Sequence, residues 1–267
     1  MSERGLSPLW LQRLALQARQ PPPRPRLSLC WLGQAVGSVQ PEWLSLMAAA
    51  GGSRFFEASS SQAHCMAEDS AGLAELAQFM RHAQLAGPWR NELLSVVNDE
   101  GHELGQIERA AVRPLGLQTQ AVHLVGQCPD GSVWVQQRAL NKPNDPGMND
   151  TLMGGMVSAN DGLAGALARE TWEEAGLHLS QLQLLRFGGS LSVQQPTSDA
   201  GGMGYMRETL HWYACTVPEG VVPCNQDGEV HAFERLGRSE LVQRLEEGRF
   251  TLEAALVLAA FLGGLSA

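Results

Sequence analysis

The sequence predicts an α+β protein in two parts, and three observations support this prediction. Residues 121–127 and 133–138 read as two strands around a C-P-D-G turn, and the second strand alternates its side chains, which is typical of a β-hairpin. A Gly-Gly pair at 154–155 then leads into a helix that carries three glutamates on one face. Before residue 118, amphipathic helices and short strands alternate, without any spacing typical of a catalytic site.

The first part is expected to span residues 1–117. Apolar positions within residues 6–20 predict a short amphipathic helix, which we interpret as the first helix of the folded chain. Four prolines within residues 21–25 end this helix and form a stiff spacer. The other expected elements are a hairpin, a helix, a strand, a second amphipathic helix and a further strand, at 27–39, 41–50, from 55, 71–86 and 89–98.

The second part is expected to span residues 118–267. After the hairpin, a loop with P-G and N-D pairs occupies residues 142–155, and a polar, glycine-rich loop is expected at 194–206. The remaining expected elements are three strands and two closing helices, at 182–192, 208–217, 230–236, 239–249 and 252–262.

Composition and charge restrict the class of protein. The 267 residues are 44% hydrophobic and 18% charged, which is ordinary for a globular protein. The net charge of −9 argues against nucleic acid or an anionic membrane surface as the main partner. No apolar run approaches the roughly 20 residues that a membrane span needs. The five cysteines are scattered without a C-x-x-C pair, so we expect a reducing, cytoplasmic location.

The helix after the Gly-Gly pair carries the clearest chemical signal. Glu170, Glu173 and Glu174 lie three and four residues apart, which places their carboxylates on one helical face. Like charges so close repel one another, and a hard divalent cation such as Mg²⁺, or alternatively Mn²⁺, would neutralise them. Arg169 precedes Glu173 by four residues and can hold its carboxylate, while Gly176 ends the helix as a C′ glycine.

A solvated acidic helix face is the commoner origin of such a charge run. The Gly-Gly pair at 154–155 argues against that interpretation here, because it brings a tight loop close to the start of the same helix. The pattern therefore favours a metal site between this loop and the helix.

The segment at residues 155–177 resembles the Nudix box, G-x5-E-x7-R-E-U-x-E-E-x-G-U, in which U is aliphatic. Asp161 stands where the box has its first glutamate, and Thr171 stands where an aliphatic residue is usual. The other defining positions are in register, namely Gly155, Arg169, Glu170, Glu173, Glu174, Gly176 and Leu177.

The resemblance implies a Nudix α/β/α sandwich with a mixed β-sheet, preceded by a smaller α+β N-terminal domain. It also implies Mg²⁺-dependent cleavage of a diphosphate linkage in a small molecule. Glu170 and Glu174 would bind metal directly, Glu173 directly or through water, and the carbonyl of Gly154 would be a further ligand. The box residues expected to support this site are Gly155, Asp161, Arg169 and Gly176.

Catalytic residues are expected among Glu173, Glu174 and Glu229. A carboxylate must take the proton from the attacking water, and Glu174 and Glu229 are the two candidates for this base. A solvated turn residue is the alternative interpretation of Glu229. Arg138 and Lys142 precede the Gly-Gly pair and could contact substrate phosphate, with a surface role as the alternative.

Segments outside the box resemble one Nudix subfamily, often described as thiamine-pyrophosphokinase-related, which carries an extra N-terminal domain. Thiamine diphosphate or its oxidised analogues, cleaved to the monophosphate and phosphate, are the substrates that this resemblance implies. The segments are ERAA, HLVG, KPNDPGMND, NQDGEV and FTLEAALVL, at 108–111, 123–126, 142–150, 225–230 and 250–258.

The box itself reports only the diphosphate, so a nucleoside-diphosphate derivative stays open as an alternative substrate. Aromatic side chains could stack on the ring system of either class of substrate. The candidates are Trp134, Trp172, Tyr205, Trp212 and Tyr213, although core positions are commoner for such residues.

Two further functions compete with hydrolysis. A non-catalytic Nudix-fold binding module is compatible with Asp161 and Thr171, but the three helix glutamates are all present. An isomerase of allylic diphosphates would need a cysteine before the helix, and none lies between Cys128 and Cys215. We rank hydrolysis first. We expect the N-terminal domain to shape substrate choice without supplying metal ligands, and we keep a homodimer as an open alternative.

Overall fold

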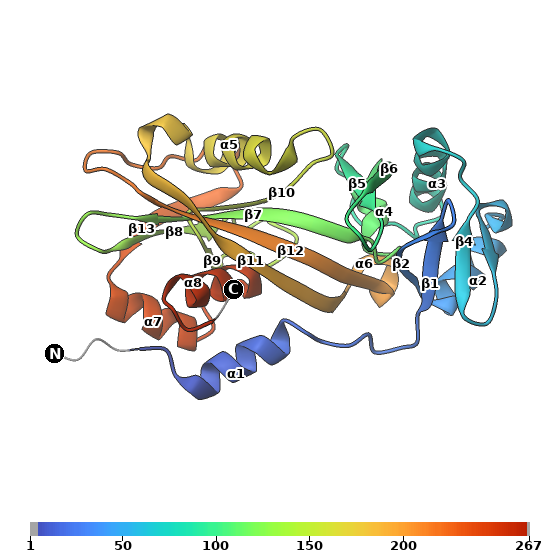
Figure 1. Ribbon diagram of the computed structural model, residues 1–267, viewed down its shortest axis with the longest axis horizontal. Helices are drawn as coiled ribbons and strands as arrows, with labels where there is room; N and C mark the ends of the chain where they lie inside the picture. The colour runs from blue at the N-terminus through green and yellow to red at the C-terminus, as the bar shows by residue number, and fades with distance from the viewer. Residues whose placement is uncertain (1–4, 266–267) are drawn as a thin grey trace.

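A mixed seven-stranded sheet forms the centre of the second part of the chain in the computed structural model, which describes residues 5–265 (Figure 1). Its main path runs β11-β12-β7-β8-β13, with β10 paired to β7 and β9 to β8. Only the β12–β7 pair is parallel among these described strands. The strands are β7 (Gln118–Gln127), β8 (Val133–Arg138), β9 (Asn149–Asp150), β10 (Met153–Met156), β11 (Gln183–Thr197), β12 (Gly204–Thr216) and β13 (Val230–Leu236).

Helices cover both faces of this sheet. Alternating residues of β7 point to opposite sides, so that Val122 and Leu124 belong to one apolar cluster and Ala121 and Val125 to the other. The predicted α/β/α sandwich with a mixed sheet is therefore confirmed. One face carries α5 (Gly162–Ala175), and the other carries α1 (Pro8–Gln17), α7 (Arg238–Glu246) and α8 (Leu252–Phe261) (Figure 1).

The N-terminal part has its own sheets and its own core, as expected for a smaller α+β unit. A four-stranded sheet runs β2-β1-β4-β3, and β5 pairs with β6. Trp31, Trp43 and Met80 are almost fully buried in its core. The boundary after residue 117 stays a prediction. The elements are β1 (Leu27–Trp31), β2 (Gln34–Val39), α2 (Pro41–Ala49), η1 (Ser53–Phe55), β3 (Phe56–Ala58), β4 (Gln62–Cys65), α3 (Ser70–His82), β5 (Leu93–Val97), β6 (Glu103–Glu108) and α4 (Arg109–Val112).

The first helix, α1, packs on the second part of the chain. Leu14 and Ala18 are buried in the same apolar cluster as α8 and the large sheet. The backbone continues this attachment, because the Gln20 amide donates to the Gln194 carbonyl at 2.8 Å and the Gln194 amide donates to the Ala18 carbonyl at 2.7 Å. The prolines that follow separate α1 from β1, so that the chain can contact both parts.

Several elements differ from the sequence-based expectations. β4 and β6 were not expected, and the polar loop expected at 194–206 is mostly strand, with β11 and β12 joined by α6 (Asp199–Gly202). Cross-strand pairing, such as Gln194 opposite Arg207, forms this hairpin. Its polar side chains lack the alternation of a half-buried strand, which explains why the sequence resembled a loop.

The tip of this hairpin joins the two parts. Ala200 and Met203 are buried in the N-terminal core, and Arg26 donates to the Met203 carbonyl at 2.7 Å. A second junction lies beside the loop before α5, where the Ala159 amide donates to the Leu93 carbonyl at 2.8 Å. These contacts hold α4 near the end of the large sheet (Figure 1).

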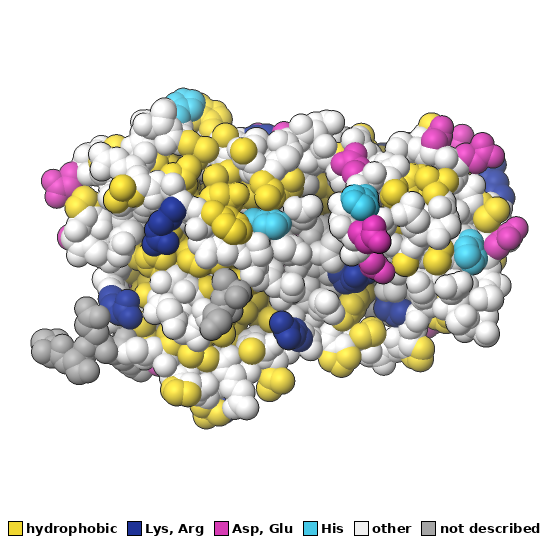
Figure 2. Space-filling view, viewed as in Figure 1, with side chains coloured by type: hydrophobic (Ala, Val, Ile, Leu, Met, Phe, Trp, Pro, Cys, Tyr) yellow, Lys and Arg dark blue, Asp and Glu magenta, His cyan; other side chains and the backbone are white. Residues whose placement is uncertain are grey.

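The surface is uneven in charge. On the face viewed in Figure 2, acidic side chains gather over the N-terminal part. Among the described residues, no helix combines the length and the apolar composition needed to cross a membrane.

Replacing Leu14 tests the attachment of α1. We expect Leu14→Ala to lower the free energy of unfolding by about 2–5 kcal/mol, because Leu14 is only 3% exposed and packs under α8. Leu16→Ala on the same helix is the control, since Leu16 is 69% exposed and should cost less than about 0.5 kcal/mol. Equal effects in urea unfolding would show that α1 is not held against the sheet.

Candidate active site

Helix α5 ends where the sequence indicates. Gly176 adopts φ +62°, and its amide donates to the Trp172 carbonyl at 2.8 Å. The unusual polar residue Thr171 is fully buried, but its hydroxyl donates to the Leu167 carbonyl at 2.6 Å. This internal hydrogen bond satisfies the hydroxyl, so the helix accommodates threonine where the family usually has an aliphatic residue.

Glu174 is the most deeply buried carboxylate of the helix face, at 3% exposure. Its Oε2 accepts hydrogen bonds from the Gln136 amide and the Gly154 backbone amide, both at 2.9 Å. Burial raises its pKa to about 8, and the charges of Asp150 and Glu170 act in the same direction against these hydrogen bonds. Without a cation nearby, this carboxyl therefore favours its protonated form at neutral pH.

Glu170 lies against Gly155, one turn before Glu174. A Cβ atom added to Gly155 would lie 2.0 Å from Cδ of Glu170, so a side chain there would displace the carboxylate. Burial raises the pKa of Glu170 to about 7, while its contact with Arg169 opposes this rise. Gly155 therefore provides the space in which the Glu170 carboxylate sits, whereas Gly154 contacts Glu174 through its backbone amide.

Arg169 connects the supporting residues of the box. Its Nε donates to Asp161 at 2.7 Å, and its Nη1 donates to Glu170 and Glu173, each at 2.9 Å. Asp161 thus reaches Arg169 despite being shorter than glutamate. Burial alone would raise the pKa of Asp161, but its hydrogen bonds from Arg169 and Ser158 outweigh that effect and lower it. Glu173 is 41% exposed and turns to Arg169.

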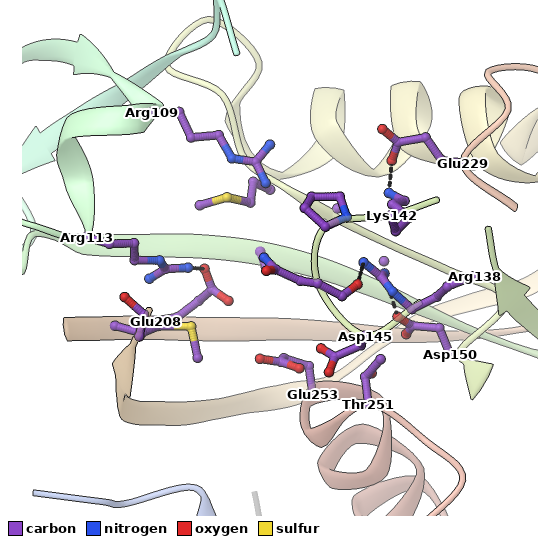
Figure 3. Close-up of a pocket in the computed structure, with 18 of the residues that line it drawn as sticks. Arg109, Arg113, Arg138, Lys142, Asp145, Asp150, Glu208, Glu229, Thr251 and Glu253 are labelled. Atoms are coloured by element: carbon purple, nitrogen blue, oxygen red, sulfur yellow. Dashed lines mark hydrogen bonds and ion pairs between the residues drawn. The ribbon is translucent and has the colours of Figure 1, made fainter. Parts of the chain in front are cut away.

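A cavity of about 490 Å³ opens beside these carboxylates (Figure 3). Gly154, Gly155, Glu170 and Glu174 line it, whereas Glu173 does not. The cavity lies at the meeting point of the N-terminal part, the large sheet and α8.

The two predicted phosphate-binding residues and Glu229 also line the cavity. Arg138 donates to Asp150 at 3.2 Å, and Lys142 forms an ion pair with Glu229 (Figure 3). The buried Nε of Arg138 has no hydrogen-bond partner among the described residues. Burial would raise the pKa of Glu229, but the Lys142 contact, together with the charges of Arg109 and Arg90, outweighs burial and lowers it.

Sequence reasoning did not single out several lining residues. Arg113, which directly follows α4, pairs with the buried Glu208 at 2.8 Å, and the Thr119 hydroxyl donates to the same oxygen at 2.8 Å. These contacts lower the pKa of Glu208 although burial would raise it. A signal was nevertheless present, because each segment of the subfamily resemblance supplies a lining residue: Arg109, His123, Asp150, Glu229 and Glu253.

None of the five aromatic candidates lines this cavity. Trp172 stacks on His178 with ring centroids 4.4 Å apart, on the outer side of α5. Tyr205 donates its hydroxyl to the Gln20 carbonyl at 2.8 Å, and Trp212 is buried beneath α8.

The lining suits a divalent cation bound together with a polyanion. Eight acidic residues and four basic ones line the cavity, so a diphosphate is accommodated more favourably when cations enter with it. Within residues 5–265, no three His, Cys, Asp or Glu side chains gather closely enough to form a complete metal site. Mg²⁺ typically takes only one or two carboxylates and completes its shell with water and substrate phosphate, which fits Glu170 and Glu174.

These raised pKa values predict a stability profile for metal-free protein. The usual carboxyl pKa is 4.5, so the folded chain binds more protons than the unfolded chain up to pH of about 7 for Glu170 and about 8 for Glu174. Their stabilising contribution is full below pH 4.5 and is lost as pH rises through those folded values. We expect the free energy of unfolding in chelator to fall between about pH 5 and 8 by on the order of a few kcal/mol.

Glu174→Gln provides the test, because glutamine keeps the shape and cannot ionise. Its metal-free profile should be flatter than that of the parent, with a higher Tm at about pH 8. Glu219→Gln, at an exposed loop position, is the control and should leave the profile unchanged. Parallel profiles for Glu174→Gln and the parent would contradict the burial argument.

Comparison with known proteins agrees with this geometry. The NUDIX domain family matches residues 117–256. Nudix hydrolase 20 of Arabidopsis thaliana is 31% identical over 160 residues, covering 58% of this chain and 42% of that protein. An uncharacterized protein of Saccharomyces cerevisiae is 29% identical over 188 residues, covering 65% of this chain and 54% of its own length. The chain thus spans about half the length of these curated relatives.

The crystal structure of DR0079 from Deinococcus radiodurans resembles this fold, with a TM-score of 0.50 and 23% sequence identity. That likeness covers 64% of this chain and 99% of DR0079, and it concerns the fold alone. Since the family match spans more than half of the 267 residues, the chain belongs to the NUDIX domain family.

Proposed function

We propose that this chain is a divalent-metal-dependent hydrolase that cleaves a diphosphate linkage in a small molecule. One observation carries the proposal: the half-buried Glu170 and the buried Glu174 contact Gly155 and Gly154 of β10, and both line an acidic cavity. Burying two carboxylates in one site is unfavourable unless a cation compensates their charges. Membership in the NUDIX domain family supports the same reaction class.

We assign the metal, Mg²⁺ or alternatively Mn²⁺, to Glu170, Glu174 and the Gly154 carbonyl. The ion would neutralise the diphosphate and lower the pKa of a bound water. Glu173 lies outside the cavity lining, so we assign it a supporting role in which Arg169 holds it.

The base that removes a proton from the attacking water is proposed to be Glu174. Glu229 is the alternative, but its ion pair with Lys142 lowers its pKa and weakens it as a base. Arg138 and Lys142 are proposed to orient the substrate phosphates. The unpartnered Nε of Arg138 supports this role, because a donor that already lacks a partner breaks no protein hydrogen bond when it donates to a phosphate oxygen.

Thiamine diphosphate or an oxidised analogue is one proposed substrate, with the monophosphate and phosphate as products. The arrangement of the five subfamily-like segments around one cavity supports it. A nucleoside-diphosphate derivative is the second candidate. It is favoured by the three arginines that line an adjoining cavity. A panel of both classes, assayed with Mg²⁺ for released phosphate and monophosphates, separates them.

A non-catalytic Nudix-fold binding module is the competing function. It predicts that members of the same panel bind without turnover. The geometry favours hydrolysis, because Asp161 and Thr171, the two departures from the box, both keep satisfied contacts.

We further propose a cytoplasmic location, since all five cysteines are free, four of them buried. A homodimer stays a prediction, which light scattering of the purified chain measures directly.

Removal of metal is the first test of the mechanism. We expect turnover of the diphosphate substrate to stop in excess EDTA and to return when Mg²⁺ or Mn²⁺ is added. The reason is that Glu170 and Glu174 leave the acidic cavity unable to accept a polyanion alone. Undiminished turnover by dialysed protein in EDTA would rule out the metal-dependent mechanism.

Substitution of Glu174 is the second test. Glu174→Gln should lower kcat about a hundredfold or more with a smaller change in KM, since a transition-state contact is typically worth ~3 kcal/mol. Glu240→Gln on α7, outside this cavity, is the matched control and should retain parental rates. Parental activity in Glu174→Gln would place the reaction elsewhere.

A further inference from the structure

A second cavity of about 540 Å³ adjoins the first at the N-terminal part. The two cavities share seven lining residues, among them Arg109, Arg113 and Asp199. One extended ligand could therefore occupy both, with one end beside the α5 carboxylates and the other beside α4.

The two cavities differ in charge. Acidic residues outnumber basic ones in the first, whereas the second is lined by Arg90, Arg109 and Arg113 against Asp199 alone. A substrate that spans both cavities would bind with a metal cation in the first, and the arginines of the second would attract an anionic group of the same substrate.

Two of the three arginines are available to a ligand. Arg113 is engaged by the buried Glu208 and is 17% exposed. Arg109 uses Nη1 for Glu92 at 2.7 Å and is 38% exposed, with its guanidinium directed toward the first cavity (Figure 3). Within residues 5–265, no carboxylate lies within ion-pair distance of the exposed Arg90.

Hydrogen bonds of their backbone amides fix the positions of Arg90 and Arg109 on neighbouring segments. The Arg90 amide donates to Glu108 Oε1 at 2.9 Å, and the Arg109 amide donates to the Glu92 carbonyl at 2.8 Å. Their charges reach the first cavity, because both contribute, after burial and Lys142, to the pKa of Glu229. Arg109 therefore lies where the two cavities join, and Arg90 lines the second cavity.

We propose that Arg90 and Arg109 form an anion subsite that binds a second phosphate-type group of the substrate, apart from the diphosphate at Glu170 and Glu174. This inference rests on the proposed function and narrows the substrate class to diphosphate compounds that carry a further phosphate. Guanidinium groups suit this ligand, because their planar N–H donors match phosphate oxygens in pairs. The cationic thiazolium ring of thiamine would be repelled from the same place.

Titration of inorganic phosphate into the full, metal-free chain tests the subsite by calorimetry. We expect saturable binding by the parent, and Arg90→Ala or Arg109→Ala should each weaken it about tenfold, since a charged hydrogen-bond pair is lost. Arg54→Ala is the matched control. Arg54 pairs with Glu75 at 3.6 Å in the same N-terminal part but lies outside both cavities, so phosphate binding should not change.

A variant that raises the affinity for phosphate separates a binding role of Arg109 from a structural one. Glu92→Gln removes the carboxylate that competes for Arg109, so phosphate should bind more tightly than to the parent. Arg90→Ala loses no ion pair, so its folding should not be at risk. Absence of phosphate binding in the parent, or equal affinity in Arg90→Ala, Arg109→Ala and the parent, would overturn the subsite.

Glu170→Gln distinguishes this proposal from the proposed function. It should lose Mg²⁺-dependent turnover yet keep the phosphate affinity of the parent, because Glu170 does not line the second cavity. Turnover without phosphate binding would refute the subsite alone. Phosphate binding by a parent without turnover of any diphosphate compound would refute the hydrolase alone.

Discussion

The close approach of two carboxylates to the two glycines of β10 organises the site. Glu170 fills the space that any side chain at position 155 would occupy, and Glu174 accepts a hydrogen bond from the neighbouring Gly154 amide. Burial makes both carboxyls hold their protons more tightly than usual. Ionising both neighbouring carboxyls therefore costs free energy in the folded chain. A cation bound between them would offset that cost.

Arg169 makes this arrangement tolerable. It joins Asp161, Glu170 and Glu173, so the acidic face of the helix is partly neutralised before any ligand binds. It also explains why a shorter aspartate can replace the first glutamate of the box, because the Arg169 side chain reaches it at 2.7 Å. A separate hydrogen bond from Arg169 holds Glu173, which does not line the cavity.

The basic side chains around the cavity mostly form ion pairs with carboxylates of neighbouring elements. Arg113 pairs with Glu208, Arg138 with Asp150, and Lys142 with Glu229, so each basic group is positioned yet partly neutralised. Two of these pairs, Arg113–Glu208 and Lys142–Glu229, join residues far apart in the chain, and the first links the N-terminal part to the large sheet at the edge of the cavity. The hairpin tip at Ala200 and Met203 anchors that part through its own core.

The sequence alone determined what local spacing encodes. Glutamates three and four residues apart share a helical face, a glycine at position 176 favours the end of that helix, and two strands around a C-P-D-G turn form the hairpin before it. Tertiary structure decided the rest: Glu173 turns outward, Lys142 pairs with Glu229 across 87 residues, and α1 packs on α8 across most of the chain. These outcomes, like the arrival of Arg109 at the cavity, depend on contacts between distant residues, and helical or strand periodicity carries no information about them.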